Sequence, residues 1–540
     1  MEGKGTLFTR KATGLVRELS IMDAIFLNMN AIVIGPVLTF VLAYWWVSFR
    51  GASVLSALWI AFIPTVALYV VYVLLTAAMP RVGGDYIFIS RILHPSIGFA
   101  ASWNTVVWNI VAFGVWGRYT VTMAISPGLA SLGMVTGNET LLNISRTIAE
   151  NNHVAFAVGT ILVLIIGVIL LRGIGATRSY WNILCGIALA GLVVNLIPLA
   201  LATKADFIQA FNQVTKPGAY EAILGIGTQL GALPLPSFSW TATLLAVAMA
   251  GSGIGWGVWS NYNAGEIKEA RSISRQMIMM LVPLLVTMIF WTLIPWLLTR
   301  VVGEDFLIAI NNAYFTDPSL VPLRGVIFPM PYHVVFGSIL SKNVLVTLII
   351  CLGNLAWFLG LMPAFIVMFI RNIFAWSFDR LAPEALSDVD ERTGVPIKAT
   401  VLVLVLGEIG VFLWTYFPGI FATQVAFYGA TFLFTFAITA IAGALFPYLR
   451  REQYAATTLA KYRIAGIPLI TVVGAIAAIF CIFVAYVNFT QPVLGVSNTI
   501  QMIVPIIIFG LGFALYFISK AIRKHQKIDL DLIYREIPPE

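Results

Sequence analysis

Two short segments rich in glycine or proline interrupt long apolar stretches, and their residues are the ones in this chain best suited to bind a small solute. They cover residues 31–36 and residues 250–256. Proline lacks an N–H, and glycine weakens a helix interior by about 1 kcal/mol relative to alanine, so both segments should open a helix. An opened helix offers amides to a carboxylate and carbonyls to an amine. The candidate binding residues are Ile34, Gly35, Pro36, Ala250, Gly251, Ser252, Gly253, Gly255 and Trp256.

Each of these residues also has a purely structural interpretation. Small residues let membrane helices pack closely, which would explain the glycines of the second segment without any bound solute. Pro36 takes one N–H away from the first segment and so leaves fewer donors for an anion. Trp256 could cover a bound ammonium group through a cation–π contact or simply pack in the core. Asn354 and Tyr428 are further candidates for the cavity wall, again with ordinary packing as the alternative.

The two segments must be positioned by membrane-spanning helices. Of 540 residues, 60% are hydrophobic and 10% are charged, and the mean hydropathy is +0.93. Because about 20 apolar residues cross a bilayer as a helix, we predict an all-α polytopic membrane protein. Its spans carry charge only at Asp23, Arg118 and Glu408. The 12 predicted transmembrane helices are 22–46, 54–79, 97–124, 154–171, 180–202, 239–264, 277–299, 343–370, 399–417, 421–447, 465–487 and 500–519.

The distribution of basic residues predicts the orientation of the chain. With the N-terminus inside, the inner segments hold 24 Lys and Arg residues, and the outer loops hold 7. This excess follows the positive-inside rule, so we expect a plasma-membrane protein with both termini cytoplasmic. The net charge of +8 is then a matter of topology, and the basic stretch 520–527 would anchor to lipid headgroups. No nucleic-acid partner is expected.

The whole chain is predicted to form a single integral membrane domain. A cytoplasmic tail (1–21) precedes a first group of five helices (22–202) and a second group of five (239–447). Two further helices (465–519) and a cytoplasmic tail (520–540) complete it. Because five is odd, the two groups can have opposite orientations, as an inverted repeat requires. The longest outer segments are 125–153, 204–238 and 300–342, and 305–314 is expected to form a short surface helix.

Three motifs follow the second, sixth and eighth predicted spans, all on the inner side. Residues 80–86 read Pro-Arg-Val-Gly-Gly-Asp-Tyr, and residues 264–271 read Ala-Gly-Glu-Ile-Lys-Glu-Ala-Arg. Residues 371–383 read Arg-Asn-Ile-Phe-Ala-Trp-Ser-Phe-Asp-Arg-Leu-Ala-Pro, with Gly-Val-Pro at 394–396. In this order they resemble the motifs of the amino acid–polyamine–organocation (APC) superfamily of permeases. The chain departs from the family at Glu269 and Ala270, where Asn-Pro is usual, and at Val37, where a second glycine is common.

The resemblance implies both a fold and a function. The fold is LeuT-like, with a 5+5 inverted repeat around the two broken helices and two extra C-terminal helices. The function is that of a secondary active transporter for amino acids or related small amines, working by alternating access. A polyamine or other organocation is an alternative substrate, and a receptor or sensor without flux is an alternative function. An enzyme is not expected, because the predicted spans contain no histidine-based metal motif, Ser/Lys dyad or paired carboxylates; no cofactor and no metal are expected either.

Charged residues at the inner mouth are candidates for a gate. Asp85 and Glu266 belong to the first two motifs and could form ion pairs with Arg91, Lys268 or Arg371. Such pairs would hold the inner side closed and would break when it opens. The alternative is that these charges are solvated in the loops.

The charges within spans have their own alternatives. Arg118, near the outer end of the third span, could gate the outer side, contact a substrate carboxylate or snorkel to the interface. Glu408 lies in the middle of the ninth span, where a structural hydrogen bond or a subunit contact is favoured over a proton relay.

Residue types that ion-coupled relatives use are absent from the corresponding parts of two spans of this chain. Sodium-coupled relatives place Ser or Thr hydroxyls in the eighth span, and none lies between Thr347 and Ser377, so sodium is not expected. Some proton-coupled relatives have a lysine in the fifth span, and residues 180–203 contain none. A proton carried by another carboxylate, exchange and uniport all remain open. The expected partners are a small-molecule substrate and membrane lipids.

Overall fold

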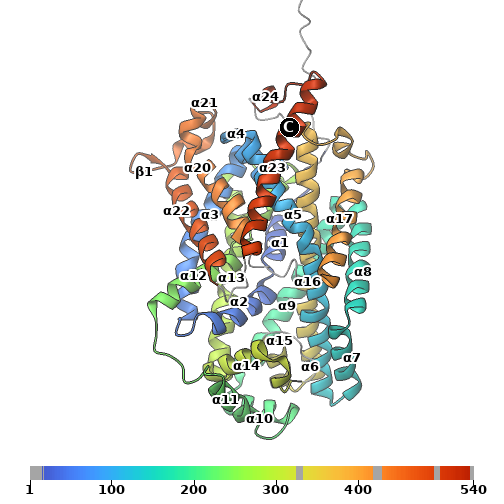
Figure 1. Cartoon of the computed structure of the whole chain (residues 1–540), viewed down its shortest axis with the longest axis vertical. Coiled ribbons are helices and arrows are strands. Elements are labelled where there is room, and N and C mark those ends of the chain that lie inside the picture. The colour runs from blue at the N-terminus through green and yellow to red at the C-terminus, as the bar shows by residue number, and fades with distance from the viewer. Residues whose placement is uncertain (1–14, 16, 324–332, 418–428, 492–498, 535–540) are drawn as a thin grey trace, which may run out of the picture.

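The chain forms a bundle of long helices with short elements at both ends (Figure 1). The computed structural model describes residue 15 and residues 17–323, 333–417, 429–491 and 499–534. Within these residues the only strands are β1 (Arg463–Ile464) and β2 (Ile467–Pro468), which pair antiparallel. The fold is therefore helical, as the composition predicts.

The first span is two helices, α1 (Ile21–Ile32) and α2 (Ile34–Ser48), joined at Val33. Ser20 and Asp23 form a capping box at the start of α1, which explains the charge of Asp23 at the beginning of this span. Val33 has left-handed backbone angles (φ +53°, ψ +60°), which is uncommon for a β-branched residue. Pro36 lies in the first turn of α2, where its missing N–H interrupts no helical hydrogen bond. The break lies within the predicted segment 31–36.

The sixth span differs from its prediction. We expected a broken helix over 239–264, but α12 (Trp240–Ile254) is the only α-helix in that range. The chain then continues through turns at 255–258 and two short 3-10 helices, η2 (Trp259–Tyr262) and η3 (Ala264–Glu266). Gly255 and Gly257 flank Trp256 at the point where the α-helix ends, and glycine stabilises a helix poorly. The last ten residues of this span, 255–264, are thus not α-helical.

The remaining spans agree with the sequence to within several residues. Ten helical stretches of the described chain are long and apolar enough to cross a membrane, and α12 is a shorter apolar helix. A multi-pass membrane protein is confirmed, whereas the full count of 12 spans and the inverted repeat stay predictions. Besides the first span (Ile21–Ser48), the ten stretches fall on α3 (Val54–Ala78), α8 (Asn152–Leu171), α9 (Ile174–Leu201), α13 (Ile273–Val301), α16 (Val344–Phe378), α17 (Ile397–Tyr416), the π-helix η6 (Phe432–Ala437) with α20 (Ile438–Leu449), α22 (Leu469–Thr490) and α23 (Thr499–His525). The third predicted span corresponds to α5 (Pro95–Tyr119) with the π-helix η1 (Thr120–Ile125), which is not one of these ten.

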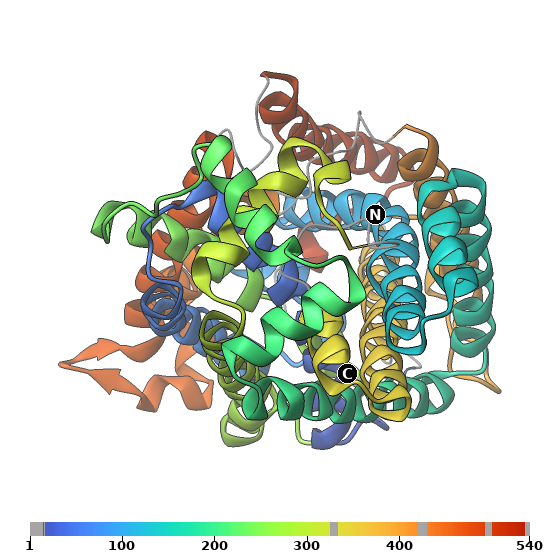
Figure 2. The same ribbon diagram turned by 90° about the horizontal axis from the view of Figure 1, so that it is seen from below.

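Short elements gather at the two ends of the bundle (Figure 1). The terminus face, near the C-terminus, has α4 (Asp85–Ile92), α21 (Arg451–Ala455), the β1–β2 hairpin and α24 (Leu530–Ile533). The loop face, at the opposite end, has α6 (Ser126–Thr136), α7 (Glu139–Glu150), α10 (Lys204–Val214), α11 (Ala219–Gln229), α14 (Glu304–Thr316) and α15 (His333–Ser341); Figure 2 looks onto this end. The 3-10 helices η4 (Pro318–Leu320), η5 (Glu384–Ser387) and η7 (Thr458–Lys461) lie in connections.

The helix expected at 305–314 is present as α14, but it is not a surface helix. Seven of its residues are buried, including Phe306, Leu307 and Ile310. Asn311 also donates a hydrogen bond to the carbonyl of Ala43 in α2. Its apolar side packs onto α11 and α2. This helix is therefore a packed part of the loop face.

The outer surface of the bundle is apolar along several helices. Large aliphatic side chains are exposed at regular intervals on α8, α9, α17 and α23, where a soluble protein would present polar residues. Lipid tails can cover such a surface without any unpaired polar group. Representative exposed residues are Ile161, Leu164, Val168, Ile183, Ile187, Val401, Val405, Ile506 and Ile507.

Candidate substrate site and gates

Carbonyl groups at the start of α2, next to the first break, accept hydrogen bonds from side chains of α13, α15 and α2 itself. The carbonyl of Ile34 accepts a hydrogen bond from the indole nitrogen of Trp291 in α13, at 2.8 Å. The carbonyl of Gly35 accepts from Thr39 Oγ1 and from His333 Nε2, both at 3.3 Å. The first amides of α2 lie at a helix N-terminus, where intrahelical partners are lacking. This end carries the positive potential that favours an anion.

A single tyrosine hydroxyl makes hydrogen bonds to backbone groups on both sides of the second break. Tyr69 in α3 donates to the carbonyl of Ile254 at 2.7 Å and accepts from the amide of Gly257, also at 2.7 Å. The indole nitrogen of Trp256 donates to the carbonyl of Ser252 at 2.6 Å. Tyr69 therefore bridges the two sides of the point where α12 ends, and it stands in for the missing helical hydrogen bonds.

The two breaks lie against each other. Asn28 of α1 accepts from the amide of Ser260 at 2.8 Å and donates to its hydroxyl at 3.0 Å. It also donates to the carbonyl of Met279 in α13 at 2.8 Å. A Cβ at Gly257 would lie 2.8 Å from Ile32 Cδ1, so the irregular backbone passes closely beside the end of α1. The structure thus joins two segments more than 200 positions apart in the sequence.

Most of the glycines predicted to unwind the sixth span lie within α12. Gly251 and Gly253 face the rings of Phe480 and Trp291, and a Cβ at either position would overlap a ring atom. The hydroxyl of Ser252, also inside α12, donates to the carbonyl of Ala248 at 2.9 Å. Ala250 lies beside them and is fully buried. Close packing accounts for these residues, and the α-helix ends only at Gly255, so their binding role stays a prediction.

The other predicted wall residues are at different places. Asn354 of α16 donates to the carbonyl of Met123 in η1 at 2.8 Å. Tyr428 lies outside the described residues. Asn354, His333 and Trp357 line one small cavity, and Asn109 and Trp116 line another; each holds about 10 Å³, roughly one water molecule. The described residues near the breaks are therefore packed closely, and admission of a solute requires them to move apart.

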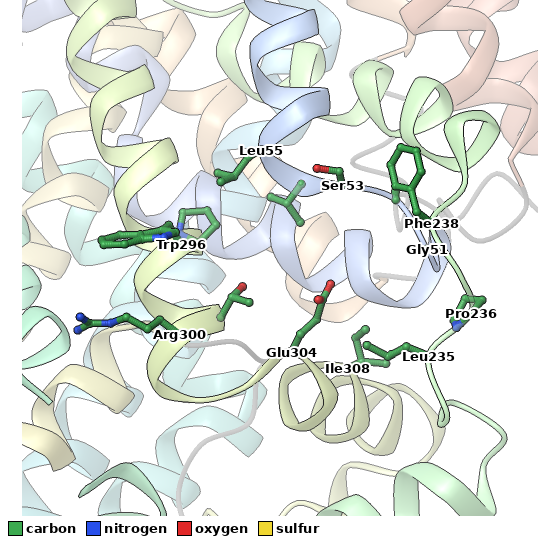
Figure 3. A pocket seen from close by; sticks show the side chains of 14 residues that line it. Gly51, Ser53, Leu55, Leu235, Pro236, Phe238, Trp296, Arg300, Glu304 and Ile308 are labelled. Atoms are coloured by element: carbon green, nitrogen blue, oxygen red, sulfur yellow. The ribbon is translucent and has the colours of Figure 1, made fainter. Parts of the chain in front are cut away.

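A much larger cavity, of about 480 Å³, opens at the loop face (Figure 3). Its walls come from the α2–α3 turn, the segment before α12, the end of α13 and the start of α14. Glu304 points into it, whereas Arg300 turns away and donates to the carbonyls of Leu199 and Ala200 at 3.0 and 2.6 Å. None of its lining residues belongs to either break, so this cavity is separate from both.

On the loop face, α15 closes over the first break. It packs between α6, α9 and α16, and His333 at its start is buried. Asn195 Nδ2 of α9 lies 2.7 Å from His333 Nδ1, and His333 Nε2 faces the carbonyl of Gly35. This carbonyl needs a donor, so Nε2 carries the proton and Nδ1 accepts from Asn195. Burial lowers the pKa of His333 to about 4, against the raising effect of the hydrogen bond to Gly35.

Acid should weaken this closure. The pKa of His333 is about 6.5 in the unfolded chain and about 4 in the folded one, so unfolding takes up a proton between these values. The folded state is therefore most stable above about pH 6.5 and loses free energy of unfolding as the pH falls towards 4. Between pH 8 and pH 5 the loss should be about 2 kcal/mol. Thermal unfolding of the purified protein should show it as a lower midpoint at pH 5. His333→Gln should reduce this pH dependence, whereas His525→Gln, at an exposed position, should keep it; equal behaviour of the two variants would contradict the assignment.

On the terminus face, two buried ion pairs connect the inner motifs. Glu266 of η3 accepts two hydrogen bonds of 2.7 Å from Arg371 of α16. Arg91 of α4 donates to both oxygens of Asp379, at 2.7 and 2.8 Å. Of the pairings that the sequence suggested, the structure therefore contains Glu266 with Arg371, while Lys268 is exposed. The role of Glu266 and Arg371 as a gate stays a prediction.

Asp85 takes hydroxyl partners in place of a cation. It is fully buried and accepts from Tyr72 of α3, from Tyr262 of η2 and, at 2.6 Å, from Thr439 of α20. Burial raises the pKa of Asp85 above its ordinary value, although the three hydrogen bonds lower it. Gly84, just before it, has φ +49° and allows the side chains of Asn261 and Tyr262 to approach the backbone. The Gly-Gly-Asp-Tyr motif thus holds the part of the sixth span that follows α12.

The described residues contain no group of three or more His, Cys, Asp or Glu side chains that could hold a metal ion. Residues 19–512 match the family described as amino acid permease, which is part of the APC superfamily. The chain belongs to the amino acid permease family. A comparison with curated proteins finds no match. Membership in a permease family implies a membrane transporter rather than an enzyme.

Arg118 and Glu408, which lie inside predicted spans of this permease, have structural partners. Arg118, close to the end of α5, donates to Asn152 Oδ1 at 2.7 Å, at the loop-face end of α8. Glu408 of α17 accepts a hydrogen bond from Thr160 of α8. The partner of Glu408 is the structural hydrogen bond that the sequence favoured; a gating or coupling role for either charge stays a prediction.

Sequence reasoning missed the residues that pair the breaks of this permease. Tyr69 and Trp291 lie among many other aromatic residues in apolar spans, and nothing in the local pattern separates them. His333 falls in an outer segment and was excluded with the other histidines. Asn28 carried a usable signal, because a buried amide in a span must find partners.

Proposed function

We propose that this permease is a secondary active transporter that moves amino acids or related small amines across the plasma membrane by alternating access. The observation that carries the proposal is the contact between the two helix breaks, which lie between a closed loop face and a closed terminus face. Paired broken helices with opposed free ends are the arrangement in which many transporters bind solutes. Family membership supports the solute class.

The substrate would bind where the breaks meet. The amides at the start of α2, at Ile34 and Gly35, suit a carboxylate, and Pro36 limits their number. Carbonyls at the end of α12 suit an ammonium group. Trp256 lies edge-on to Phe432 and Phe436, at 6.2 and 5.8 Å between ring centroids, so an aromatic wall stands beside the second break. An α-amino acid carries both charged groups and would use both breaks.

Access would alternate between the two faces. We take the terminus face as cytoplasmic, because of its excess of basic residues. There, separation of Glu266 from Arg371 and of Arg91 from Asp379 would open the site; on the other side, withdrawal of α15 from Gly35 would do so. A co-transported proton is compatible with this scheme, and sodium is not expected since no Ser or Thr lies in α16 between Thr347 and Ser377.

Uptake by purified protein in proteoliposomes tests the proposal. Labelled neutral amino acids, cationic amino acids and polyamines would be offered with and without an inward proton gradient. Accumulation of at least one amino acid or small amine above protein-free vesicles is expected. Saturable binding without any uptake would favour the receptor alternative, and uptake of polyamines alone would favour the organocation alternative. Absence of both binding and uptake would overturn the proposal.

A further inference from the structure

The end of the chain folds back onto the terminus face. After α23 the backbone turns at Lys527 (φ +61°), Asp529 caps α24, and Tyr534 follows it. Leu530 and Tyr534 are 1% and 5% exposed. Lys520 of α23 donates to both carboxylate oxygens of Asp531, at 2.6 and 2.8 Å. Residues 529–534, here called the C-terminal segment, are thus docked, close to the end of α23 (Figure 1).

Tyr534 contacts the ion pair that joins α4 to α16. The hydroxyl of Tyr86 in α4 donates to Asp379 Oδ2 at 2.6 Å, because a carboxylate only accepts. Its oxygen is therefore the acceptor in the 2.8 Å bond between the two phenols, and Tyr534 is the donor. Arg91 also lies over the ring of Tyr534, with 4.6 Å between Cζ and the ring centroid, in the range of a cation–π contact.

The phenol of Tyr534 keeps the proton that it donates. Burial and then the charge of Asp379 raise the pKa of Tyr534 well above its ordinary value. The hydrogen bonds therefore run in one direction, from Tyr534 through Tyr86 to Asp379. Arg91 also donates to Asp379, at the end of this chain of hydrogen bonds.

The same part of the chain is anchored to the end of α16. Arg523, in the last turn of α23, donates to the carbonyl of Arg380 at 2.7 Å and to that of Ala382 at 2.9 Å. Ser519 donates to the carbonyl of Leu381 at 2.7 Å. The turn after α16 therefore holds α23, and the C-terminal segment reaches from there to α4.

We propose that the C-terminal segment is an autoinhibitory clamp that holds α4 against the end of α16 and so keeps the terminus face closed. It rests on the proposed function, because opening of this face is a step of alternating access. The segment is held by Tyr534, the buried Leu530 and the pair of Asp531 with Lys520, so it can undock while the bundle stays folded. Losing one hydrogen bond and one cation–π contact should make opening about 5- to 30-fold more frequent.

Hydrogen–deuterium exchange of the purified full chain tests the clamp without any solute. Tyr534→Ala should raise the exchange rate of the α4 amides about 5- to 30-fold and leave those of α11, on the loop face, unchanged. Tyr534→Phe keeps the ring, loses the donor and should give a smaller increase. The matched control is Tyr462→Ala, which removes a tyrosine that is 46% exposed in the turn before β1 and should change neither helix.

A chain that ends at Ile528 gives a second variant with the same expected result as Tyr534→Ala. Unchanged α4 exchange in Tyr534→Ala would overturn the clamp, as would an equal rise in α4 and α11, which indicates general destabilisation. If the shortened chain fails to fold, Tyr534→Ala decides alone. A failure of wild-type uptake would count against the proposed function and would leave the exchange result standing.

Discussion

Replacing Glu266 by glutamine is expected to lower the free energy of unfolding by about 3–5 kcal/mol, because it leaves the guanidinium of Arg371 buried without a counter-charge. The side chains of Arg371 and Glu266 are 6% and 2% exposed, so water cannot solvate the unpaired cation in the closed structure. Thermal and denaturant unfolding of the purified protein would measure the loss. The same change should favour conformations in which Arg371 reaches water, namely those with the terminus face open.

An exposed pair of the same type provides the control for this prediction. Arg146 and Glu150, 3.0 Å apart in α7, are 69% and 53% exposed, and Glu150→Gln should change stability by less than about 0.5 kcal/mol. Combining Glu266→Gln with Arg371→Met should recover much of the lost stability, because no charge is then left buried. Equal effects of Glu266→Gln and Glu150→Gln would show that the buried pair contributes little.

The sequence predicted the position of the first break better than that of the second. Gly35 and Pro36 mark the start of a new helix, and the left-handed residue, Val33, is two positions before Gly35. In the second segment, the sequence predicts unwinding at Gly251, Gly253 and Gly255, yet Gly251 and Gly253 give space to Phe480 and Trp291 inside a regular helix. A glycine is needed both where a helix ends and where a ring approaches, and composition alone does not separate the two cases.

Long-range partners explain the remaining differences. Tyr69 lies 185 positions from Ile254, and Asn28 lies 232 positions from Ser260. The motifs predicted that Arg91, Glu266 and Arg371 would be close, because all three belong to the same face. They did not predict that Arg91 would form an ion pair with Asp379, 288 positions away. Nor did they predict that the side chain of Asp85 would accept hydrogen bonds from hydroxyl groups alone.

The two faces are closed by different chemistry. On the loop face the contacts of α15 are neutral and include a histidine that burial keeps unprotonated. On the terminus face the contacts are ion pairs and phenol–carboxylate hydrogen bonds, with the C-terminal segment against them. Acid should therefore loosen the loop face through protonation of His333. Because the charges of the terminus face are already paired, added salt should matter little there while the pairs stay buried.

The second large effect is expected from Tyr69→Phe, which removes one oxygen atom at the centre of the bundle. Its loss leaves the carbonyl of Ile254 and the amide of Gly257 without their partner, and each unpaired buried group costs about 1–3 kcal/mol. We expect stability to fall by about 2 kcal/mol or more. Uptake should fall about tenfold or more, since the same two groups fix the shape of the second break. Unfolding and initial uptake rates in proteoliposomes measure the two effects.

Tyr516→Phe is the matched control for this variant. Tyr516 of α23 is also fully buried, but within the described chain its hydroxyl has no hydrogen-bond partner. Removing that oxygen should leave stability unchanged or slightly higher and should not alter uptake, because no partner is left unpaired. If Tyr69→Phe behaved like Tyr516→Phe, the hydroxyl of Tyr69 would not be what maintains the break, and the backbone around Gly257 would have to be held by its packing against Ile32 and Tyr69 carbon atoms alone.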